Sequence, residues 1–340
     1  NSVSKEQAGL LVIVFVSLAF ILIRLLMPIK FDGSYIDEYW HITSGISLLE
    51  TGDYAYLYNH GRVYDRGALM SLWVGLWVTL FGKSILVAKL APASIAIINY
   101  VLFLYLTTRL VAKRRFQILL LALYTLSPWV IFNHFYIRFY ITNELFLLIL
   151  LVLGYQLYEA LRDSNWKGVL QYLSMVILLN ILSMFAIRDQ SEYMLLLASG
   201  VMLAGLFIYE FNPDVKHENR LTSIVFRNVL LSNEVYRAFI VLVVAIIGSI
   251  VMDSSSKLDF LLHGAITYSS MPGFKYDWFF WEKNSLITVF FVFGVITFWW
   301  KSSGFERIIL PVAGALFLVH YVSSDELQII RGILYFMPLY

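Results

Sequence analysis

The sequence predicts an all-α, polytopic membrane protein, and three observations lead to this fold class. Apolar residues make up 60% of the chain and charged residues only 14%, whereas soluble domains average about 45–50% apolar residues. Apolar runs long enough to cross a bilayer recur from one end of the chain to the other. Aromatic residues, 17% of the total, suit the interfacial belts of membrane helices, while a β-barrel would show short segments of alternating polarity.

The apolar runs give the expected elements in order. They lie at about 10–29, 69–82, 85–110, 117–132, 139–160, 168–187, 191–209, 238–252, 285–300, 308–322 and 329–340. The second run is short, because a helix over Ala68–Phe81 is only about 21 Å long, and it is expected to lie along the membrane interface or dip into it rather than span. The others predict a single transmembrane domain over residues 1–340 with roughly ten spans. Because the chain begins at Asn1 and stops at Tyr340 inside an apolar run, a further C-terminal part is expected.

Basic residues gather at alternate ends of the predicted spans. Clusters occur at 109–115, 162–167, 216–237 and 301–307, and such clusters mark the cytoplasmic side. The opposite side carries three predicted outer loops, at 30–84, 133–140 and 253–284. The last of these mixes aromatic residues with carboxylates, so it is expected either to cover a site as a lid or to form an interfacial belt. The net charge of +2 and the lack of cysteine imply neither nucleic acid binding nor thiolate chemistry.

An acidic pair, Asp37 and Glu38, lies just beyond the first apolar run. Ionisable groups at a membrane boundary are costly unless they are solvated or used in function. The segment from Asp37 to Leu49 predicts a helix on the membrane surface, because apolar residues recur at three- and four-residue spacing. These apolar residues are Tyr39, Ile42, Ile46 and Leu49, and Gly52 follows the predicted end of the helix. The acidic pair is therefore the first candidate for chemistry.

Several short blocks resemble a known family. They are Asp37–His41, Leu48–Tyr54, Tyr64–Leu69, Leu80–Ser84, Ala88–Pro92, Leu126–Trp129, Tyr136–Tyr140 and Arg331–Leu334 with Pro338. In this order they resemble the outer loops and a late span of membrane glycosyltransferases of the GT-C superfamily. The resemblance is to the protein O-mannosyltransferase and aminoarabinose transferase families, which use sugars carried on polyprenyl phosphate. It covers residues 30–145 well, and the remainder only through hydropathy and the order of spans.

The resemblance implies an inverting glycosyltransferase with a GT-C-like bundle, working on the outer face of an inner or plasma membrane. Its partners would be a polyprenyl-phosphate sugar donor, an acceptor hydroxyl on a glycan, lipid or protein, and membrane lipids. Asp37 would act as general base towards the acceptor, and Glu38 would orient the acceptor or the base. This chemistry requires no cofactor. A divalent cation held by Asp37, His41 and Asp65 is an alternative, although their spacing matches no specific ligand motif.

The departing phosphate needs cations, and arginine presents a planar fork of donors that matches phosphate oxygens. The candidates are Arg66 and Arg138, followed by Arg62 and Arg331. Asp65 would hold Arg66 or bind the sugar, and His41 lies one helical turn after Asp37. Each residue also has a structural alternative that involves no chemistry. Asp37 suits a helix cap, Arg66 a surface ion pair, and Arg138 a contact with lipid headgroups, while a structural role is expected for His41.

Two other functions stay open from the sequence. Arg24, Arg138 and Glu144 lie in or near apolar runs, as the charges of a transporter or flippase pathway would. Against this, the sequence shows no inverted repeat with broken helices in matching positions. The third function is that of a non-catalytic membrane subunit with a glycosyltransferase shape. No Gly-rich phosphate loop occurs in the sequence, which argues against an ATP-driven pump or a nucleotide-sugar enzyme.

Overall fold

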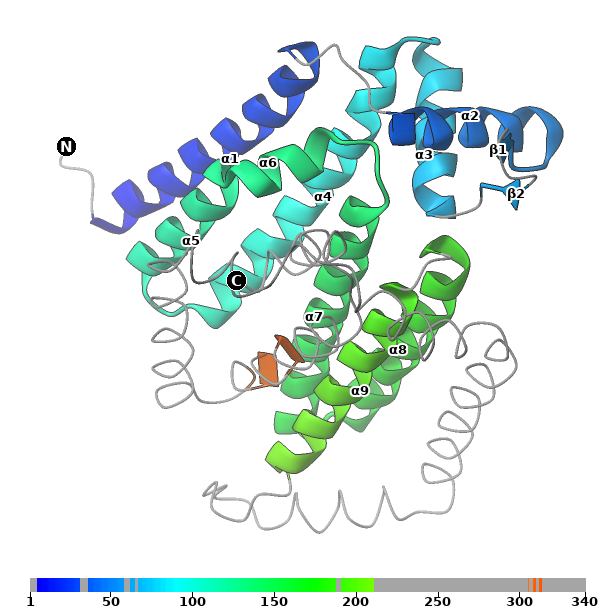
Figure 1. The fold of residues 1–340 in the computed structure, drawn as a ribbon. Helices are drawn as coiled ribbons and strands as arrows, with labels where there is room; N and C mark the ends of the chain where they lie inside the picture. The colour runs from blue at the N-terminus through cyan, green and yellow to red at the C-terminus, as the bar shows by residue number, and fades with distance from the viewer. Residues whose placement is uncertain are drawn as a thin grey trace, which may run out of the picture. The chain divides into compact units, whose positions relative to one another are not determined.

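The part of the chain that the structure describes is mostly helical, with one short antiparallel pair of strands (Figure 1). The structure, a computed structural model, describes residues 5–30, 36–57, 62–64, 67–187, 191–210, 305, 308–309 and 312–313. The helices are α1 (Lys5–Lys30), α2 (Ile36–Thr51), α3 (Ala68–Phe81), α4 (Ile85–Leu110), α5 (Arg114–Leu126), α6 (Pro128–Phe135), α7 (Tyr140–Arg162), α8 (Trp166–Ile187) and α9 (Ser191–Glu210). Strands β1 (Tyr56–Leu57) and β2 (Arg62–Val63) pair antiparallel between α2 and α3.

Four of the described helices, α1, α4, α7 and α8, are long and apolar enough to cross a membrane. The chain is therefore a helical membrane protein, as its composition predicts. Helix α3 is an apolar helix of 14 residues and is not among these four, and the surface position predicted for 69–82 stays a prediction. The predicted runs at 238–252, 285–300 and 329–340, most of the run at 308–322, and the loop at 253–284 lie outside the described residues.

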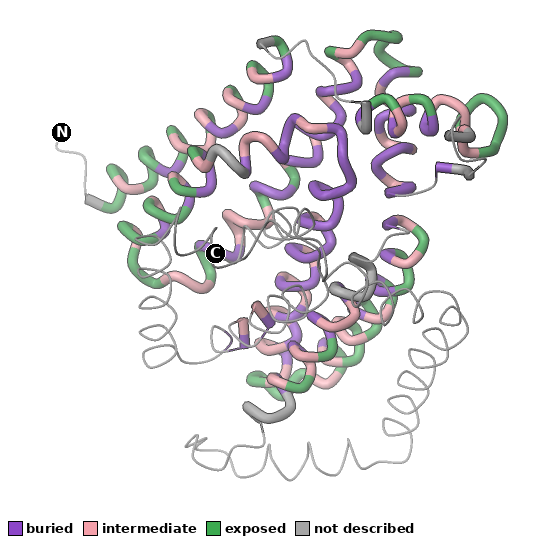
Figure 2. The backbone as a smooth tube through the Cα atoms, viewed as in Figure 1, coloured by how far each residue is buried: buried purple, intermediate pink, exposed green. Residues whose placement is uncertain are grey.

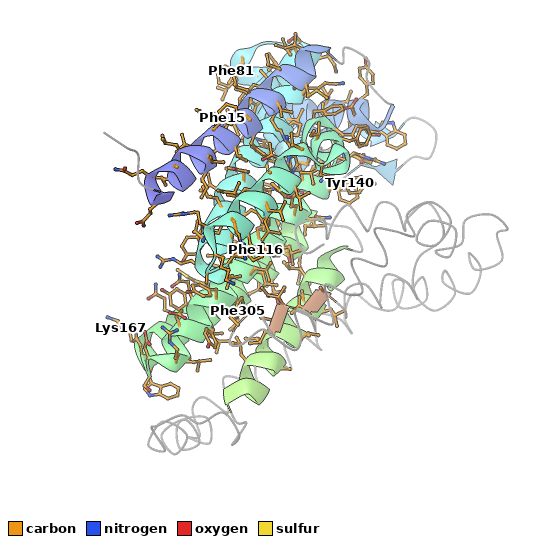
Figure 3. All side chains as sticks on the ribbon, turned by 90° about the vertical axis from the view of Figure 1, so that its left-hand side faces the viewer. Phe15, Phe81, Phe116, Tyr140, Lys167 and Phe305 are labelled. Carbon is orange, nitrogen blue, oxygen red and sulfur yellow. The ribbon has the colours of Figure 1, made fainter. Side chains whose placement is uncertain are left out.

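Helix α1 divides into an inward and an outward face. One face packs along α4, α5 and α6 (Figure 1). The other exposes large apolar side chains, among them Leu11, Phe15 and Leu22. Phe15 is labelled in Figure 3, together with Phe81, another exposed ring at the end of α3. Apolar surface of this extent suits contact with lipid chains, for which such side chains need no protein partner.

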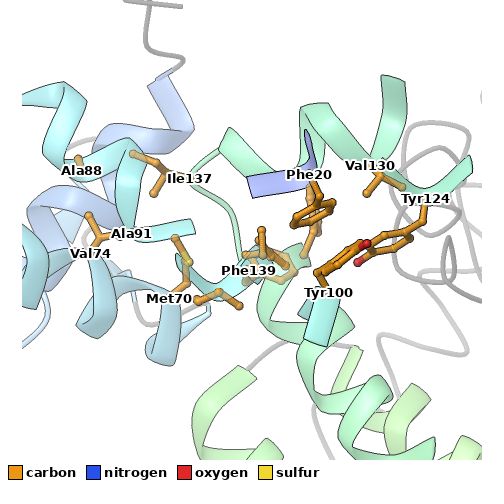
Figure 4. Close-up of a cluster of buried hydrophobic side chains, with 14 of the residues drawn as sticks. Phe20, Met70, Val74, Ala88, Ala91, Tyr100, Tyr124, Val130, Ile137 and Phe139 are labelled. Atoms are coloured by element: carbon orange, nitrogen blue, oxygen red, sulfur yellow. The ribbon is translucent and has the colours of Figure 1, made fainter. Parts of the chain in front are cut away.

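Two compact units make up the chain. The first comprises residues 1–153, 178–196 and 334–340, and its core is drawn in Figure 4, where the rings of Phe20 and Tyr100 stack with centroids 4.2 Å apart. The first half of α7 is almost continuously buried (Figure 2). The second unit comprises residues 154–177 and 197–333. In it, the ring of Phe305 packs against Tyr155 and Tyr158 of α7.

The apolar run at 117–132 was predicted as one span, but the structure divides it between two helices. Helix α5 ends at Leu126 and α6 begins at Pro128, with Ser127 between them at a ψ of 120°. Proline lacks the N–H that would continue the hydrogen-bond ladder and disfavours the helical conformation at the residue before it. The Ser127 hydroxyl caps α6 by accepting a hydrogen bond from the N–H of Val130 at 3.4 Å. The short α6 then leads into the turn that the candidate site uses.

Helices α2 and α3 cross in direct backbone contact at Gly45 and Gly75. A β-carbon at Gly45 would overlap the carbonyl group of Ser71, and one at Gly75 would overlap the carbonyl group of Gly45. Small residues allow membrane-associated helices to approach this closely. The crossing fixes α2 on α3, and it thereby determines which face of α2 turns towards the protein interior.

Alanine at Gly45 or Gly75 is expected to destabilise the protein by about 1–3 kcal/mol, because the added methyl group forces the two backbones apart. The measurement is the apparent melting temperature of the purified protein in detergent. Gly200→Ala in α9 is the matched control, since a β-carbon there meets nothing within 4 Å. It should leave the melting temperature unchanged or raise it slightly. Equal melting temperatures for Gly45→Ala and Gly200→Ala would contradict the close crossing.

Candidate functional site

Helix α2 turns a polar face inward. Its fully buried polar residues are Glu38, His41 and Ser44, which share one side of the helix. The predicted membrane-facing residues are divided between two environments. Tyr39 and Leu49 are 52% and 38% exposed, whereas Ile42 and Ile46 pack against the core of the first unit. The helix predicted from the apolar spacing is therefore present, and its buried side consists of groups suited to chemistry or hydrogen bonding.

The carboxylate of Glu38 joins α2 to two other segments. Its Oε1 atom accepts a hydrogen bond from the backbone N–H of Ile137 at 3.0 Å. Its Oε2 atom lies 3.9 Å from Nζ of Lys89 on α4, and neither side chain is more than 2% exposed. A buried charge is costly unless it is paired and hydrogen-bonded, so Glu38 and Lys89 stabilise one another. Glu38 thereby holds the start of α2, where Asp37 is its neighbour, against α4 and the turn between α6 and α7.

His41 is also engaged within the protein. Its Nδ1 atom lies 2.9 Å from Oγ of Ser71 on α3, and its Nε2 atom lies 3.0 Å from the hydroxyl of Tyr64. The Ser44 hydroxyl donates to the carbonyl oxygen of Tyr64 at 2.6 Å. Both ring nitrogens of His41 therefore contact hydroxyl groups of the protein, and its role in substrate binding stays a prediction.

Gly67 lies in close contact with two further segments of the first unit, the turn before α7 and the end of α8. It adopts the left-handed conformation at φ 63°, before α3, where glycine carries little penalty. A β-carbon there would overlap Phe139 and would lie 3.1 Å from Cε1 of His41. Its N–H donates to the carbonyl oxygen of Ile187, at the end of α8, with a distance of 2.7 Å. The predicted first and second outer loops and the end of α8 therefore meet.

Arg138 lies in the turn between α6 and α7 and is only 6% exposed. Its guanidinium carbon lies 5.9 Å from the ring centre of Tyr136 and 5.7 Å from that of Tyr140, so the cation is flanked by two aromatic rings. Arg138 directly follows Ile137, whose N–H is held by Glu38. The turn thus places an arginine next in sequence to a backbone group bound by Glu38.

Several predicted site residues cannot be placed at this level of detail. Asp65, Arg66 and Arg331 lie outside the described residues, and so do the side chains of Asp37 and Arg62, whose backbones belong to α2 and β2. Among the residues that the structure does describe, no group of three histidine, aspartate or glutamate side chains could hold a metal ion. The predicted cation site of Asp37, His41 and Asp65 depends on two side chains outside this part of the chain.

A second group of buried polar side chains lies between the helices of the first unit. It consists of Arg24 on α1, Tyr124 on α5, His134 on α6 and Glu144 on α7, called here the Glu144 network. The carboxylate of Glu144 accepts a hydrogen bond from the hydroxyl of Tyr124, and its Oε2 atom lies 3.0 Å from Nε2 of His134. Nε of Arg24 donates to Nδ1 of His134 at 3.3 Å. One network therefore ties together four helices.

Arg24 also completes the end of α5. Its guanidinium donates to the carbonyl oxygen of Thr125 at 2.7 Å and to that of Tyr124 at 3.5 Å. The last carbonyl groups of a helix have no partner within the helix, and the break at Pro128 leaves these two groups in a buried position. A cation at a helix C-terminus is also favoured by the helix dipole. The guanidinium carbon also lies over the ring of Phe20, 4.1 Å from its centroid.

The hydrogen bonds of His134 define its tautomer. A guanidinium can only donate, so Nδ1 must be the acceptor and the ring proton must lie on Nε2, facing Glu144. Burial lowers the pKa of His134 below its usual 6.5, although the nearby Glu144 carboxylate opposes this shift. The ring is therefore held neutral, and the network contains one positive and one negative group, Arg24 and Glu144.

Sequence analysis did not single out Lys89 or His134 as functional residues. Lys89 lies inside the apolar run at 85–110, and an ionisable residue in a membrane span is itself a signal of function or pairing. This signal identified Arg24 and Glu144, which supported the alternative of a transporter or flippase. His134, at the border of an apolar run, carried no distinguishing pattern.

Comparison with known proteins found no matching family model, no matching curated protein and no matching solved structure.

Proposed function

We propose that this protein is an inverting glycosyltransferase that moves a sugar from polyprenyl phosphate to an acceptor hydroxyl. It would be a GT-C-like bundle of roughly ten membrane helices, with its site facing the periplasm or exterior of an inner or plasma membrane. The observation that carries the proposal is the buried pair of Glu38 and Lys89, beside the turn that contains Ile137 and Arg138. Glu38 thus connects the start of α2 with Lys89 of α4 and with the turn that carries Arg138.

The reaction needs few groups. The acceptor oxygen would bond to the anomeric carbon while the bond from that carbon to the phosphate oxygen breaks, and polyprenyl phosphate would leave with the electron pair. Asp37 would take the hydroxyl proton, and Glu38 would hold Asp37 in position through the start of α2. Arg138 and Arg66 would stabilise the phosphate. Lys89 would balance the charge of Glu38 but not that of Asp37. The carboxylates of Asp37 and Glu38 would therefore have different surroundings, and only Asp37 would act as the base.

The transport alternative depended on charges within apolar runs. Arg24 and Glu144 are bonded to other groups of the protein in the Glu144 network. These two residues therefore have a structural account that requires no pathway, and the glycosyltransferase proposal is preferred.

The proposal is tested by transfer from labelled donors. The purified full-length protein in nanodiscs is given polyprenyl-phosphate mannose, arabinose or glucose, with peptides, glycolipids and polysaccharides from membrane extracts as acceptors. A new glycosidic bond, detected by mass spectrometry, supports the proposal. Movement of the labelled lipid between leaflets without a new bond would instead establish a flippase, and neither result would be expected of an isolated subunit.

Arg138→Ala and Arg66→Ala are expected to weaken binding of polyprenyl-phosphate sugar by about tenfold to a hundredfold each, the effect of losing a charged hydrogen bond. The measurement is the dissociation constant for a fluorescent donor analogue. Arg162→Ala is the control, because Arg162 lies at the end of α7 and pairs with Glu159 at 2.7 Å. Arg138→Lys separates charge from packing if the alanine variant does not fold. Unchanged donor affinity in both arginine variants would exclude them as the phosphate clamp.

A further inference from the structure

The Glu144 network takes no part in the proposed reaction, although its polar groups are buried in the first unit. Its position in the sequence relates it to the site. His134 precedes the turn at Tyr136–Phe139, and Glu144 follows it. The hydrogen bond between their side chains, 3.0 Å long, therefore closes the segment that carries Ile137 and Arg138.

Hydrogen bonds within the turn, and others between the Glu144 network and α5, add to this contact. Within the turn, the N–H of Arg138 donates to the carbonyl oxygen of Tyr136 at 2.8 Å. Those of Thr142 and Asn143 donate to the carbonyl oxygen of Phe139 at 3.1 and 3.0 Å. The network itself is attached to α5 through the two carbonyl groups that Arg24 binds. A shift of the short α6 along its axis would break these contacts and would move the N–H of Ile137 away from Glu38.

We propose that His134 and Glu144, held by Arg24, are positioning residues that keep the turn at Tyr136–Phe139 seated against Glu38. The inference goes beyond the proposed function, because the turn would be positioned in this way whatever reaction the site performs. It gives a role to the buried charges of Arg24 and Glu144, which take no part in the proposed sugar transfer. It also explains why a histidine, with one acceptor and one donor nitrogen, stands between a cation and a carboxylate.

Protonation of His134 would disrupt these hydrogen bonds, because Nδ1 could no longer accept from Arg24. The charged and titratable groups facing the His134 ring are Arg24 from α1, Tyr124 from α5 and Glu144 from α7. A second ring proton would lie on Nδ1 and would point at the guanidinium of Arg24. Since burial holds the pKa of His134 below its usual 6.5, the unfolded chain binds the proton more readily than the folded one. The stabilisation of the turn by neutral His134 is therefore complete above the usual pKa of histidine. It is lost as pH falls through the lower pKa that His134 has in the folded protein.

The test is amide hydrogen exchange of the full-length protein in nanodiscs, read on peptides covering residues 134–140 and corrected for the intrinsic pH dependence of exchange. His134→Leu is expected to raise exchange there by about tenfold or more, because it leaves Glu144 and Arg24 without a shared partner. His134→Gln retains one acceptor and one donor, so it should exchange nearly as the wild type does at pH 7. As pH falls from about 7 to 5, the wild type should lose protection and His134→Gln should keep it.

Gln117→Leu is the matched control. Gln117 is a buried polar residue that donates to the carbonyl oxygen of Val111 at 2.6 Å, away from the turn in sequence. It should lower overall stability without selective exchange at residues 134–140. If Gln117→Leu opens this segment as much as His134→Leu does, or if His134→Gln and the wild type share one pH dependence, the positioning role is wrong. The measurement uses no sugar donor, so failure of the glycosyltransferase proposal would not affect it.

Discussion

Asp37→Asn is expected to lower the rate of sugar transfer by about 10²- to 10⁴-fold, the range that a general base contributes. Asparagine has nearly the same shape, but its amide cannot accept the proton of the acceptor hydroxyl. Glu38, next in sequence, cannot readily replace it, because its carboxylate is buried and occupied by Lys89 and the N–H of Ile137. Donor affinity should change little, since the phosphate would be bound by arginines.

Asp53→Asn serves as the control for this experiment. Asp53 lies in the same predicted outer loop, just beyond the end of α2, and is exposed. Its replacement removes one negative charge from that loop without altering the start of α2, so transfer should stay near the wild-type rate. Initial rates with a saturating labelled donor give the comparison. If Asp37→Asn and Asp53→Asn transfer sugar equally fast, Asp37 is not the base.

Glu144→Leu is expected to destabilise the protein by about 3–5 kcal/mol, because removal of one member of a buried charged network leaves the other charge uncompensated. Arg24 would keep its positive charge without its counter-ion, and the hydroxyl of Tyr124 and Nε2 of His134 would lose their acceptor. The free energy of unfolding is followed by tryptophan fluorescence during titration of mixed micelles with sodium dodecyl sulfate. Glu159→Leu, on the same helix, removes a carboxylate paired at the surface with Arg162 and should cost less than about 1 kcal/mol.

The double variant Arg24→Leu with Glu144→Leu distinguishes charge pairing from packing. Removing both charges should cost less than the sum of the two single changes, by about 1–3 kcal/mol, because neither charge is then left alone. Part of the loss should persist, since the carbonyl groups of Tyr124 and Thr125 would lose the donor that completes α5. Simple addition of the two single effects would show that Arg24 and Glu144 act independently.

Hydropathy predicted the described helices well because lipid exposure imposes a composition on each span. The apolar runs at 85–110 and 168–187 coincide with α4 and α8 to within two residues at each end. The break before Pro128 was missed because the apolar run continues through it, although proline itself is a known signal for a helix start. The short β pair between α2 and α3 was also absent from the prediction, since two-residue strands leave almost no periodic pattern.

The partners of the buried polar groups could not be predicted in the same way. Glu38 was identified from its place beyond the first span, but its contacts with Lys89 and Ile137 join segments far apart in sequence. Hydropathy treats each segment alone and carries no information on which charges meet. Arg24 and Glu144 show the same limit, because a residue that belongs to a network and one that lines a pathway have the same local sequence.

The hydrogen bond from Gly67 to Ile187 has a consequence for biosynthesis. Protein chains are made from the N-terminus, so Gly67 leaves the ribosome long before the end of α8. The contact that the α2–α3 segment makes with α8 through Gly67 can therefore form only after α4 to α8 have been synthesised. Final docking of this segment becomes a late event of assembly, and an arrest of synthesis before α8 would leave it without this anchor.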